Sequence, residues 1–373
     1  MNKNLKEVAS VFFKLGCIAF GGPAAHIAMM EKEIVEKRQW MTQQHFLDLM
    51  GATNLIPGPN STEMTMHCGH ERAGWMGLFV AGACFIFPAV VITGILAYLY
   101  VEYGELPNVA PFIEGIKPAV LAIILGAVIK LGKKAVKNTE LAVLGILALA
   151  LSFSGISEVI ALLITGVIGL LYFSIKNRTA GPTKAFLPLI LLQSGQLFTF
   201  SGTTLKVFLT FLKVGAILYG SGYVLFAYLD AELVATGLLT RPELIDAIAI
   251  GQFTPGPVLS TATFIGYQLN GIPGAIAASI GIFLPSFLFV LILNPWIPKM
   301  RKSKTLSYFL DAVNVAAVAI MVAVLAKMGM DIFTDWRPVF ICALAIFAAF
   351  QLKLSSMWIV LGGAVLGWVL AFI

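Results

Sequence analysis

Two kinds of glycine-proline break interrupt the apolar segments of this chain. One is Gly-Gly-Pro at 21–23, and the other is Pro-Gly-Pro, which occurs at 57–59 and again at 255–257. Proline is well tolerated in the first turn of a helix, so Pro23 is expected to open a short helix over 24–30. The free N–H groups and the dipole at a helix N-terminus favour anions. The chemistry that these breaks predict is recognition of a small oxyanion.

Hydroxyl, amide and lysine side chains accompany the breaks in both halves of the chain. In the first half the candidate substrate-binding residues are Lys14, Gly21, Gly22, Pro23, Asn54, Pro57, Gly58, Pro59, Asn60 and Thr62. In the second half they are Lys213, Gly220, Ser221, Gly222, Gln252, Pro255, Gly256, Pro257, Ser260 and Thr261. A single break would be explained equally well as a packing kink, because glycine and proline are frequent in membrane helices. The lysines have an alternative as interfacial anchors, but the recurrence of the whole pattern favours a site.

Acidic residues near the predicted helix ends are candidates for coupling or gating. They are Glu33, Glu63, Glu114, Glu232 and Asp311. Acids within membrane segments usually have a function, whereas acids at helix N-termini also simply stabilise the helix. Ion pairing, proton coupling and a solvated position therefore all stay open for this set. His26 has no counterpart in the second half, which favours a structural role for it.

Composition places the chain in a membrane. Of its 373 residues 59% are hydrophobic and 12% are charged, whereas soluble domains carry about 25% charged residues. Crossing a bilayer takes roughly 20 apolar residues, and such runs recur, for example around 78–99, 141–173 and 272–293. The net charge of +6 is spread over short loops, so membrane topology explains it better than nucleic-acid binding does.

Sequence motifs of enzymes and cofactor sites are missing from the chain. There is no HExxH, GxSxG, Walker or strand-linked GxGxxG pattern. The four cysteines, and His67 with His70, lack the spacing of a metal site. We therefore expect no enzyme activity, no metal and no cofactor. A membrane enzyme acting on a lipid-linked substrate is the remaining catalytic alternative, and the scattered acids and histidines disfavour it.

The chain is predicted to be a tandem duplication. "FFKLGCIAFGG" at 12–22 matches "FLKVGAILYGSG" at 211–222, and "LDLMGATNLIPGP" at 47–59 matches "IDAIAIGQFTPGP" at 245–257. The matching lysines, glycines and Pro-Gly-Pro triplets lie 198 or 199 residues apart. The predicted division is an N-terminal transmembrane repeat at 1–178, a connector at 179–198 and a C-terminal transmembrane repeat at 199–373.

Loop charges indicate that the two repeats have opposite orientations. In the first half the loop at 102–108 is acidic and that at 130–137 is basic, whereas in the second half the loop at 299–304 is basic and that at 331–335 is acidic. By the positive-inside rule the halves then lie upside down relative to each other. Such an inversion requires an odd number of crossings in each half.

Counting apolar segments gives five crossings in each half. In the first half they lie around 7–30, 74–100 and 111–132, with two more forming a hairpin through 141–173. Residues 43–59 must then be re-entrant; if they crossed, the total would be twelve instead of ten and the inversion would fail. The predicted fold is an all-α integral membrane protein with two inverted repeats of about five transmembrane helices each, broken or re-entrant at Gly-Gly-Pro and Pro-Gly-Pro.

The stretch "FFKLGCIAFGGPAAHIAMMEKE" at 12–33, followed by "GATNLIPGPNSTEM" at 51–64, resembles the chromate ion transporter (CHR) family in its long, two-domain form. The resemblance covers essentially the whole chain. It implies a bacterial or archaeal inner-membrane carrier that exports chromate and so confers chromate resistance, with sulfate as a competitor. Tyr223 stands where Pro23 would map in the second half, which indicates an asymmetric site.

The expected function is therefore secondary transport of a small oxyanion, chromate first, out across the cytoplasmic membrane by alternating access. Without an ATP-binding motif, the energy is expected to come from an ion gradient or the membrane potential. An anion channel or uniporter, and a carrier for a different oxyanion such as sulfate, stay open. The expected partners are the oxyanion and the lipid bilayer, with no nucleic acid, and a homodimer is left open.

Overall fold

The computed structural model describes residues 3–20, 22–53, 55–177, 202–219, 222–293, 296 and 303–372. In these ranges the chain is helical, with no strand. The first half contains α1 (Lys3–Ile18), α2 (Pro23–Glu31), η1 (Lys32–Lys37), α3 (Gln43–Thr53), α4 (Asn60–Tyr103), α5 (Ala110–Ala135), α6 (Thr139–Phe153) and α7 (Glu158–Lys176). The second half contains α9 (Thr203–Ile217), η4 (Gly222–Val224), α10 (Leu225–Leu229), η5 (Asp230–Val234), α11 (Arg241–Phe253), η6 (Val258–Ser260), α12 (Thr261–Leu293), α14 (Lys304–Ile332), α15 (Trp336–Phe350) and α16 (Ser356–Leu370). The predicted connector at 179–198, with Gly21, Asn54, Gly220 and Ser221, lies outside the described residues.

Five of the described helices are long and apolar enough to cross a bilayer. They are α4, α5, α7, α14 and α12 together with η6. Three shorter apolar helices, α6, α15 and α16, accompany them. The prediction of an all-α membrane protein is therefore confirmed.

The segment around 7–30, expected as one crossing, consists of two helices. Helix α1 ends at Ile18 and α2 begins at Pro23, with Gly22 at its N-cap in a left-handed conformation (φ 80°). Glycine adopts positive φ without the steric penalty that a side chain brings. Gly-Gly-Pro thus opens a short helix where the sequence predicted one.

Helices α4 and α12 each contain a reverse turn that the sequence analysis did not anticipate. The turns lie at Ala73–Gly74 and at Asn270–Gly271, where both glycines have positive φ. A Cβ added to Gly69 would lie 2.3 Å from the carbonyl oxygen of Gly77, although eight residues of continuous helix span about 12 Å. The first turns of α4, from Asn60 to the turn, therefore run antiparallel to the rest of α4.

The long helix after each reverse turn packs closely on the first helix of its own half. A Cβ on Gly16 of α1 would lie 2.6 Å from the carbonyl oxygen of Phe85 in α4. In the second half a Cβ on Gly215 of α9 would lie 2.4 Å from the carbonyl oxygen of Ile282 in α12. Small residues at such contacts let helix backbones approach. The same contact thus occurs at corresponding positions of both halves.

Helices later in each half pack against helices of the other half. Gly166 and Gly169 of α7 face Val313 and Ala312 of α14, so a first-half helix packs on a second-half one. Reciprocally, α16 packs on α5, where a Cβ on Gly115 would lie 2.3 Å from the carbonyl oxygen of Gly363. Each half therefore supplies a helix to the other.

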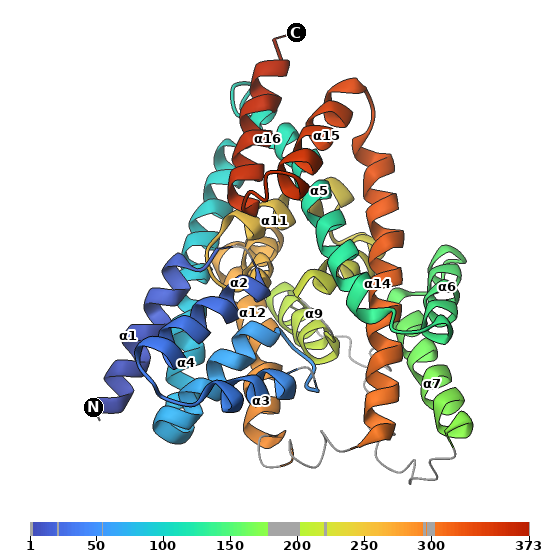
Figure 1. The fold of residues 1–373 in the computed structure, drawn as a ribbon. Coiled ribbons are helices and arrows are strands. Elements are labelled where there is room, and N and C mark those ends of the chain that lie inside the picture. The colour runs from blue at the N-terminus through green and yellow to red at the C-terminus, as the bar shows by residue number, and fades with distance from the viewer. Residues whose placement is uncertain are drawn as a thin grey trace.

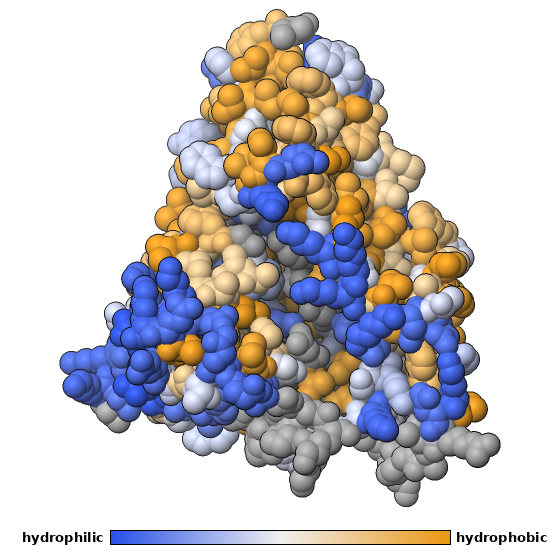
Figure 2. Space-filling view, viewed as in Figure 1, coloured by the Kyte–Doolittle hydropathy of each residue, from blue (hydrophilic) through white to orange (hydrophobic). Residues whose placement is uncertain are grey.

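The arrangement in space is visible in Figure 1. Helices α5 and α14 run in opposite directions along the molecule, and the α6–α7 and α15–α16 hairpins lie toward opposite ends. Figure 2 shows mostly hydrophobic surface in the upper part of this view, over α15 and α16, and hydrophilic surface gathered at the lower left, over the N-terminal helices. Trp336, Phe347 and Trp358 of these two helices are exposed. Apolar surface of this extent fits contact with lipid.

Candidate functional site

The Pro-Gly-Pro break of each half is bonded to the first break of the other half. The N–H of Gly58 donates to the carbonyl oxygen of Leu218 at 2.6 Å, and the N–H of Gly256 donates to that of Ala19 at 2.8 Å. Leu218 and Ala19 directly follow α9 and α1, and they occupy equivalent positions in the repeat. The two bonds are therefore one interaction made twice, with the halves exchanged.

The first breaks of the two halves also lie against each other. A Cβ placed on Gly222 would lie 4.0 Å from Cγ of Pro23 and within 3.7 Å of Val258 and Leu259, which follow the second Pro-Gly-Pro. The structure therefore gathers all four breaks at one central place. It brings Gly22, Pro23, Gly58, Gly222 and Gly256, all candidate site residues, together there.

Within the first half, His26 links the first break to the segment after Pro-Gly-Pro through two hydrogen bonds. Its Nε2 lies 3.1 Å from the carbonyl oxygen of Ala19 and its Nδ1 lies 3.3 Å from the hydroxyl of Ser61. Because a carbonyl only accepts, Nε2 carries the proton and Nδ1 accepts from Ser61. The buried ring is thus fully paired, in keeping with the structural role expected for it.

The centre is closed in this structure. Gly58 lies so close to its surroundings that an added Cβ would meet Oε1 of Glu63 at 2.2 Å and Oγ of Ser286 at 2.5 Å. At Gly256 an added Cβ would lie 2.8 Å from Cβ of Ala89, which is the residue equivalent to Ser286. A ligand can reach these glycines only after the packed elements separate.

Several buried polar groups in the candidate segments have no hydrogen-bond partner among the described residues. They are Thr62 Oγ1, both carboxylate oxygens of Glu63, Gln252 Nε2 and Ser286 Oγ. Buried polar groups are normally paired, and leaving one unpaired is costly. Ser260, in contrast, accepts from Thr93, and Thr261 donates to the carbonyl oxygen of Val258. The unpaired groups are those free to bind a ligand.

The predicted lysines lie away from the closed centre. Lys14 is exposed on α1, and Lys213 forms an ion pair with Glu232 at 2.7 Å. Glu33, which is equivalent to Glu232, instead pairs with Lys37 at 3.0 Å and Arg38 at 3.3 Å. Both glutamates thus take part in ion pairs, one of the alternatives that the sequence left open.

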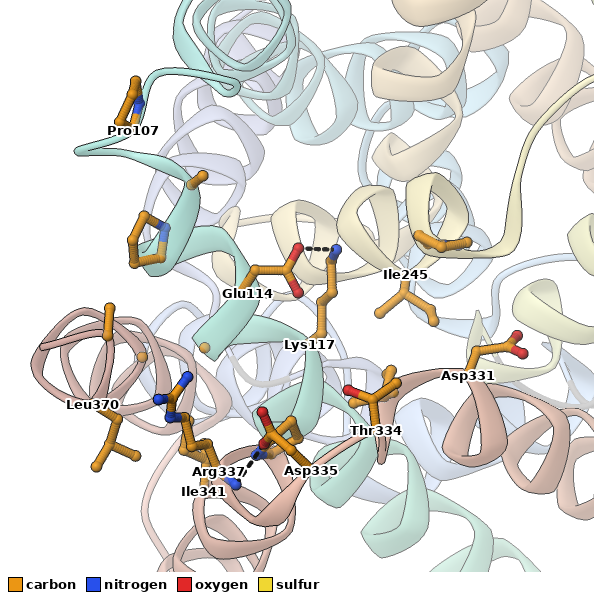
Figure 3. Close-up of a pocket in the computed structure, with 18 residues that line it drawn as sticks. Pro107, Glu114, Lys117, Ile245, Asp331, Thr334, Asp335, Arg337, Ile341 and Leu370 are labelled. Atoms are coloured by element: carbon orange, nitrogen blue, oxygen red, sulfur yellow. Dashed lines mark hydrogen bonds and ion pairs between the residues drawn. The ribbon is translucent and has the colours of Figure 1, made fainter. Parts of the chain in front are cut away.

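Two cavities occupy opposite ends of helices α5 and α14. The larger, about 640 Å³, is lined by Glu114, Lys117, Asp331, Asp335 and Arg337, and we name it the acidic cavity. Figure 3 shows Glu114 and Lys117 paired on α5, with Thr334 and Asp335 across the cavity from them.

Residues at equivalent positions of the repeat line the smaller cavity, of about 360 Å³. Here Lys134 and Lys137 stand where the acidic cavity has Asp331 and Thr334; we name it the basic cavity. Asp311, the equivalent of Glu114, pairs with Lys137 at 2.6 Å. The lining of the basic cavity also includes Leu55 and Val224, which lie next to two of the breaks. This cavity therefore leads from a basic rim toward the closed centre.

Some features of the site were not predicted from the sequence. Ser286 follows Pro285 and has no polar counterpart, since Ala89 stands in its place. The carbonyl groups of Ala19 and Leu218 act through the backbone, which side-chain reasoning overlooks. The reverse turns did leave a trace, because Gly69, Gly74 and Gly77 recur 197 residues later as Gly266, Gly271 and Gly274.

Membrane-length helices interrupted near a shared centre that holds buried and unpaired polar groups are typical of membrane transporters. The family model described as "Chromate transporter" matches residues 6–170 and, a second time, residues 205–368. The chain belongs to the chromate transporter family. The double match agrees with the duplication seen in the sequence.

The names of three similar proteins agree with this family. The chain is 30% identical over 373 residues to a chromate transport protein of Cupriavidus metallidurans, covering 97% of this chain and 92% of that protein. It is 29% identical over 377 residues to a probable chromate transport protein of Synechococcus elongatus, covering 98% and 95% respectively. A chromate transport protein of Pseudomonas aeruginosa is 27% identical over 378 residues, with 96% and 90% covered. No solved structure matches the chain significantly.

Proposed function

We propose that this protein is a secondary transporter that exports a small oxyanion, chromate first, across the cytoplasmic membrane by alternating access. The observation that carries the proposal is the reciprocal pair of bonds from Gly58 to Leu218 and from Gly256 to Ala19. They join four helix breaks at one centre, and transporters with discontinuous helices bind substrate at such places. The family and the names of the relatives support chromate as the substrate.

Inverted repeats form part of this proposal. The opposite directions of α5 and α14, and the placement of the two hairpins toward opposite ends, support an inversion of residues 199–373 relative to 1–178. Ten crossings, with re-entrant α3 and α11, follow from the predicted topology. In such proteins one half rocks against the other around a fixed site. The bonds between the breaks are the contacts that this movement would rearrange.

The cavities support a direction of loading. The basic cavity reaches Leu55 and Val224 beside the breaks, and the positive-inside rule places its lysine-rich rim in the cytoplasm. An inside-negative potential favours export by about 2.3 kcal/mol per charge per 100 mV, and hence about twice that for a dianion. The tightly closed centre favours a carrier over an open channel, because a channel needs a continuous path.

The test is uptake of radiolabelled chromate into everted membrane vesicles, in which the cytoplasmic face is outside. We expect saturable uptake by the wild type, inhibition by excess sulfate, and loss of uptake in Gly22→Leu, since Gly22 has positive φ at the centre. Gly155→Leu is the matched control: Gly155 also has positive φ, but an added Cβ would contact nothing within 4 Å. Uptake no greater than in vesicles without the protein, with a potential imposed, would contradict the chromate assignment.

A further inference from the structure

Glu63 is an acidic residue whose two side-chain oxygens are both buried and without a hydrogen-bond partner among the described residues. It is completely buried in the first turn of α4. Neither carboxylate oxygen has a hydrogen-bond partner among the described residues, and none of the described lysines or arginines pairs with it. Ionising a buried carboxyl group without a partner is very unfavourable, so such a group keeps its proton. In this closed state Glu63 is therefore a neutral carboxylic acid, which has one O–H donor.

A second unpaired group lies beside it. Ser286 of α12 is also completely buried, and its hydroxyl has no partner among the described residues. Oε1 of Glu63 and Oγ of Ser286 both lie within 2.5 Å of the point where a Cβ on Gly58 would be. Two donors from opposite halves thus converge on the backbone of one break. Because Gly58 has no side chain, a ligand oxygen can take this place when the halves separate.

No ion pair with Glu63 is present among the described residues. Titratable groups near it include His26 of α2, whose ring is occupied by Ala19 and Ser61, His67 one turn further along α4, and Tyr219 after α9. Its equivalent in the second half is Thr261, a neutral hydroxyl residue. Both halves therefore place a group with an O–H donor at this position of the break.

We propose that Glu63 binds the transported oxyanion as a neutral acid, donating its proton in a hydrogen bond together with the hydroxyl of Ser286. This inference rests on the oxyanion-transport function proposed above and specifies how the site recognises its ligand. An ionised Glu63 would repel an anion bound beside Gly58, since like charges in a buried site interact strongly. Neutral hydrogen-bond donors bind the oxyanion without a positively charged group that would hold it in the site.

The experiment uses the full-length purified protein in liposomes, with downhill chromate flux measured from pH 6 to pH 9 at zero membrane potential. Wild-type flux is expected to fall several-fold toward pH 9, because a higher pH favours the ionised form of Glu63, which cannot donate to the oxyanion and repels it. Glu63→Gln keeps a neutral donor and should retain flux within about tenfold of the wild type, without the fall at high pH. Glu63→Met, of similar size but without a donor, should lose flux. Glu105→Gln, in the exposed loop after α4, should keep the wild-type profile.

Two results with the variants would overturn the assignment. One is a folded Glu63→Gln protein that does not transport at any pH, as expected if a carboxylate must load and release a proton. The other is Glu63→Gln with the wild-type pH profile. Infrared difference spectra of the wild type on adding chromate give a readout that needs no variant: the carbonyl band of a protonated carboxyl should shift, and its absence at pH 7 contradicts the proposal. Absence of chromate flux in the wild type at every pH would instead contradict the proposed function.

Discussion

Gly58 and Leu218 belong to different halves of the chain, yet the N–H of one donates to the carbonyl oxygen of the other at 2.6 Å. Leu218 stands directly after α9, where the helix has ended and its last carbonyl groups need partners. Gly58 supplies one such partner, and Gly256 supplies another to Ala19 after α1. The breaks thus satisfy each other's backbone groups inside the protein. A conformational change that parts them must provide replacements: water or an oxyanion can accept from the freed N–H of Gly58, and water can donate to the freed carbonyl oxygen of Leu218.

Gly256→Ala is expected to reduce transport strongly. An added Cβ would lie 2.8 Å from Cβ of Ala89 and 3.3 Å from the carbonyl oxygen of Gly16, in a residue whose φ is 88°. Left-handed conformation alone costs about 1–2 kcal/mol for a residue with a side chain. Gly155→Ala shares that cost (φ 85°) but meets no neighbour, so it should lose stability alone. Chromate flux per folded molecule separates a loss of transport from a loss of stability. Equal flux in Gly256→Ala and Gly155→Ala would argue against a role for the second Pro-Gly-Pro break in transport.

Gly115→Ala should destabilise the fold without touching the centre. The new Cβ would lie 2.3 Å from the carbonyl oxygen of Gly363 and 2.5 Å from Cα of Gly367, both in α16. Overpacking of this kind costs about 1–3 kcal/mol. Gly126→Ala, on the same helix, meets only Phe350 at 3.8 Å and should be neutral or slightly stabilising, because alanine favours helix. Thermal unfolding in detergent measures both, and equal melting temperatures would contradict the close packing of α5 on α16.

Lys134→Glu should raise the KM for chromate several-fold with little change in kcat. Lys134 lines the basic cavity, and charge at the mouth of a cleft raises the local concentration of an oppositely charged ligand. The effect should weaken at high salt, since the Debye length falls to about 3 Å at 1 M. Lys133→Glu changes the net charge equally but lies outside the cavity lining, so it should affect KM less. Similar KM values for both variants would indicate that the cavity is not the route of entry.

Lys213→Met and Glu232→Gln should each have small effects on stability. Their ion pair is partly exposed, with side-chain exposures of 32% and 18%, and exposed pairs contribute about 1 kcal/mol or less. A double-mutant cycle on thermal stability should give a coupling energy of that size. If Lys213→Met abolished transport while Glu232→Gln did not, Lys213 would have a role in binding beyond this pair.

The sequence was informative where the chain breaks its own helices. Gly-Gly-Pro and Pro-Gly-Pro mark the start of α2 and the ends of α3 and α11, because glycine and proline act on the local backbone regardless of what surrounds them. No comparable motif in the sequence predicted the contacts between the halves. The bond from Gly58 to Leu218 joins backbone groups in segments far apart in the chain, and any residue supplies a carbonyl oxygen.

The isolation of Glu63 was equally hidden from the sequence. An acid four residues after Pro59 is typical of a helix N-terminus, where it stabilises the first turn. Only the structure shows that Gly58 and Ser286 pack against it and that none of the described lysines or arginines pairs with it. Lys14 shows the reverse case: its recurrence as Lys213 favoured a place in the predicted site, whereas its side chain is exposed on α1.

The exchange of helices between halves has a consequence for how the protein is made. On α5, Gly115 packs against α16, which comes much later in the chain. The N-terminal half therefore cannot complete this contact with its own helices, and α5 keeps an unfilled packing surface until α16 has been synthesised and inserted beside it.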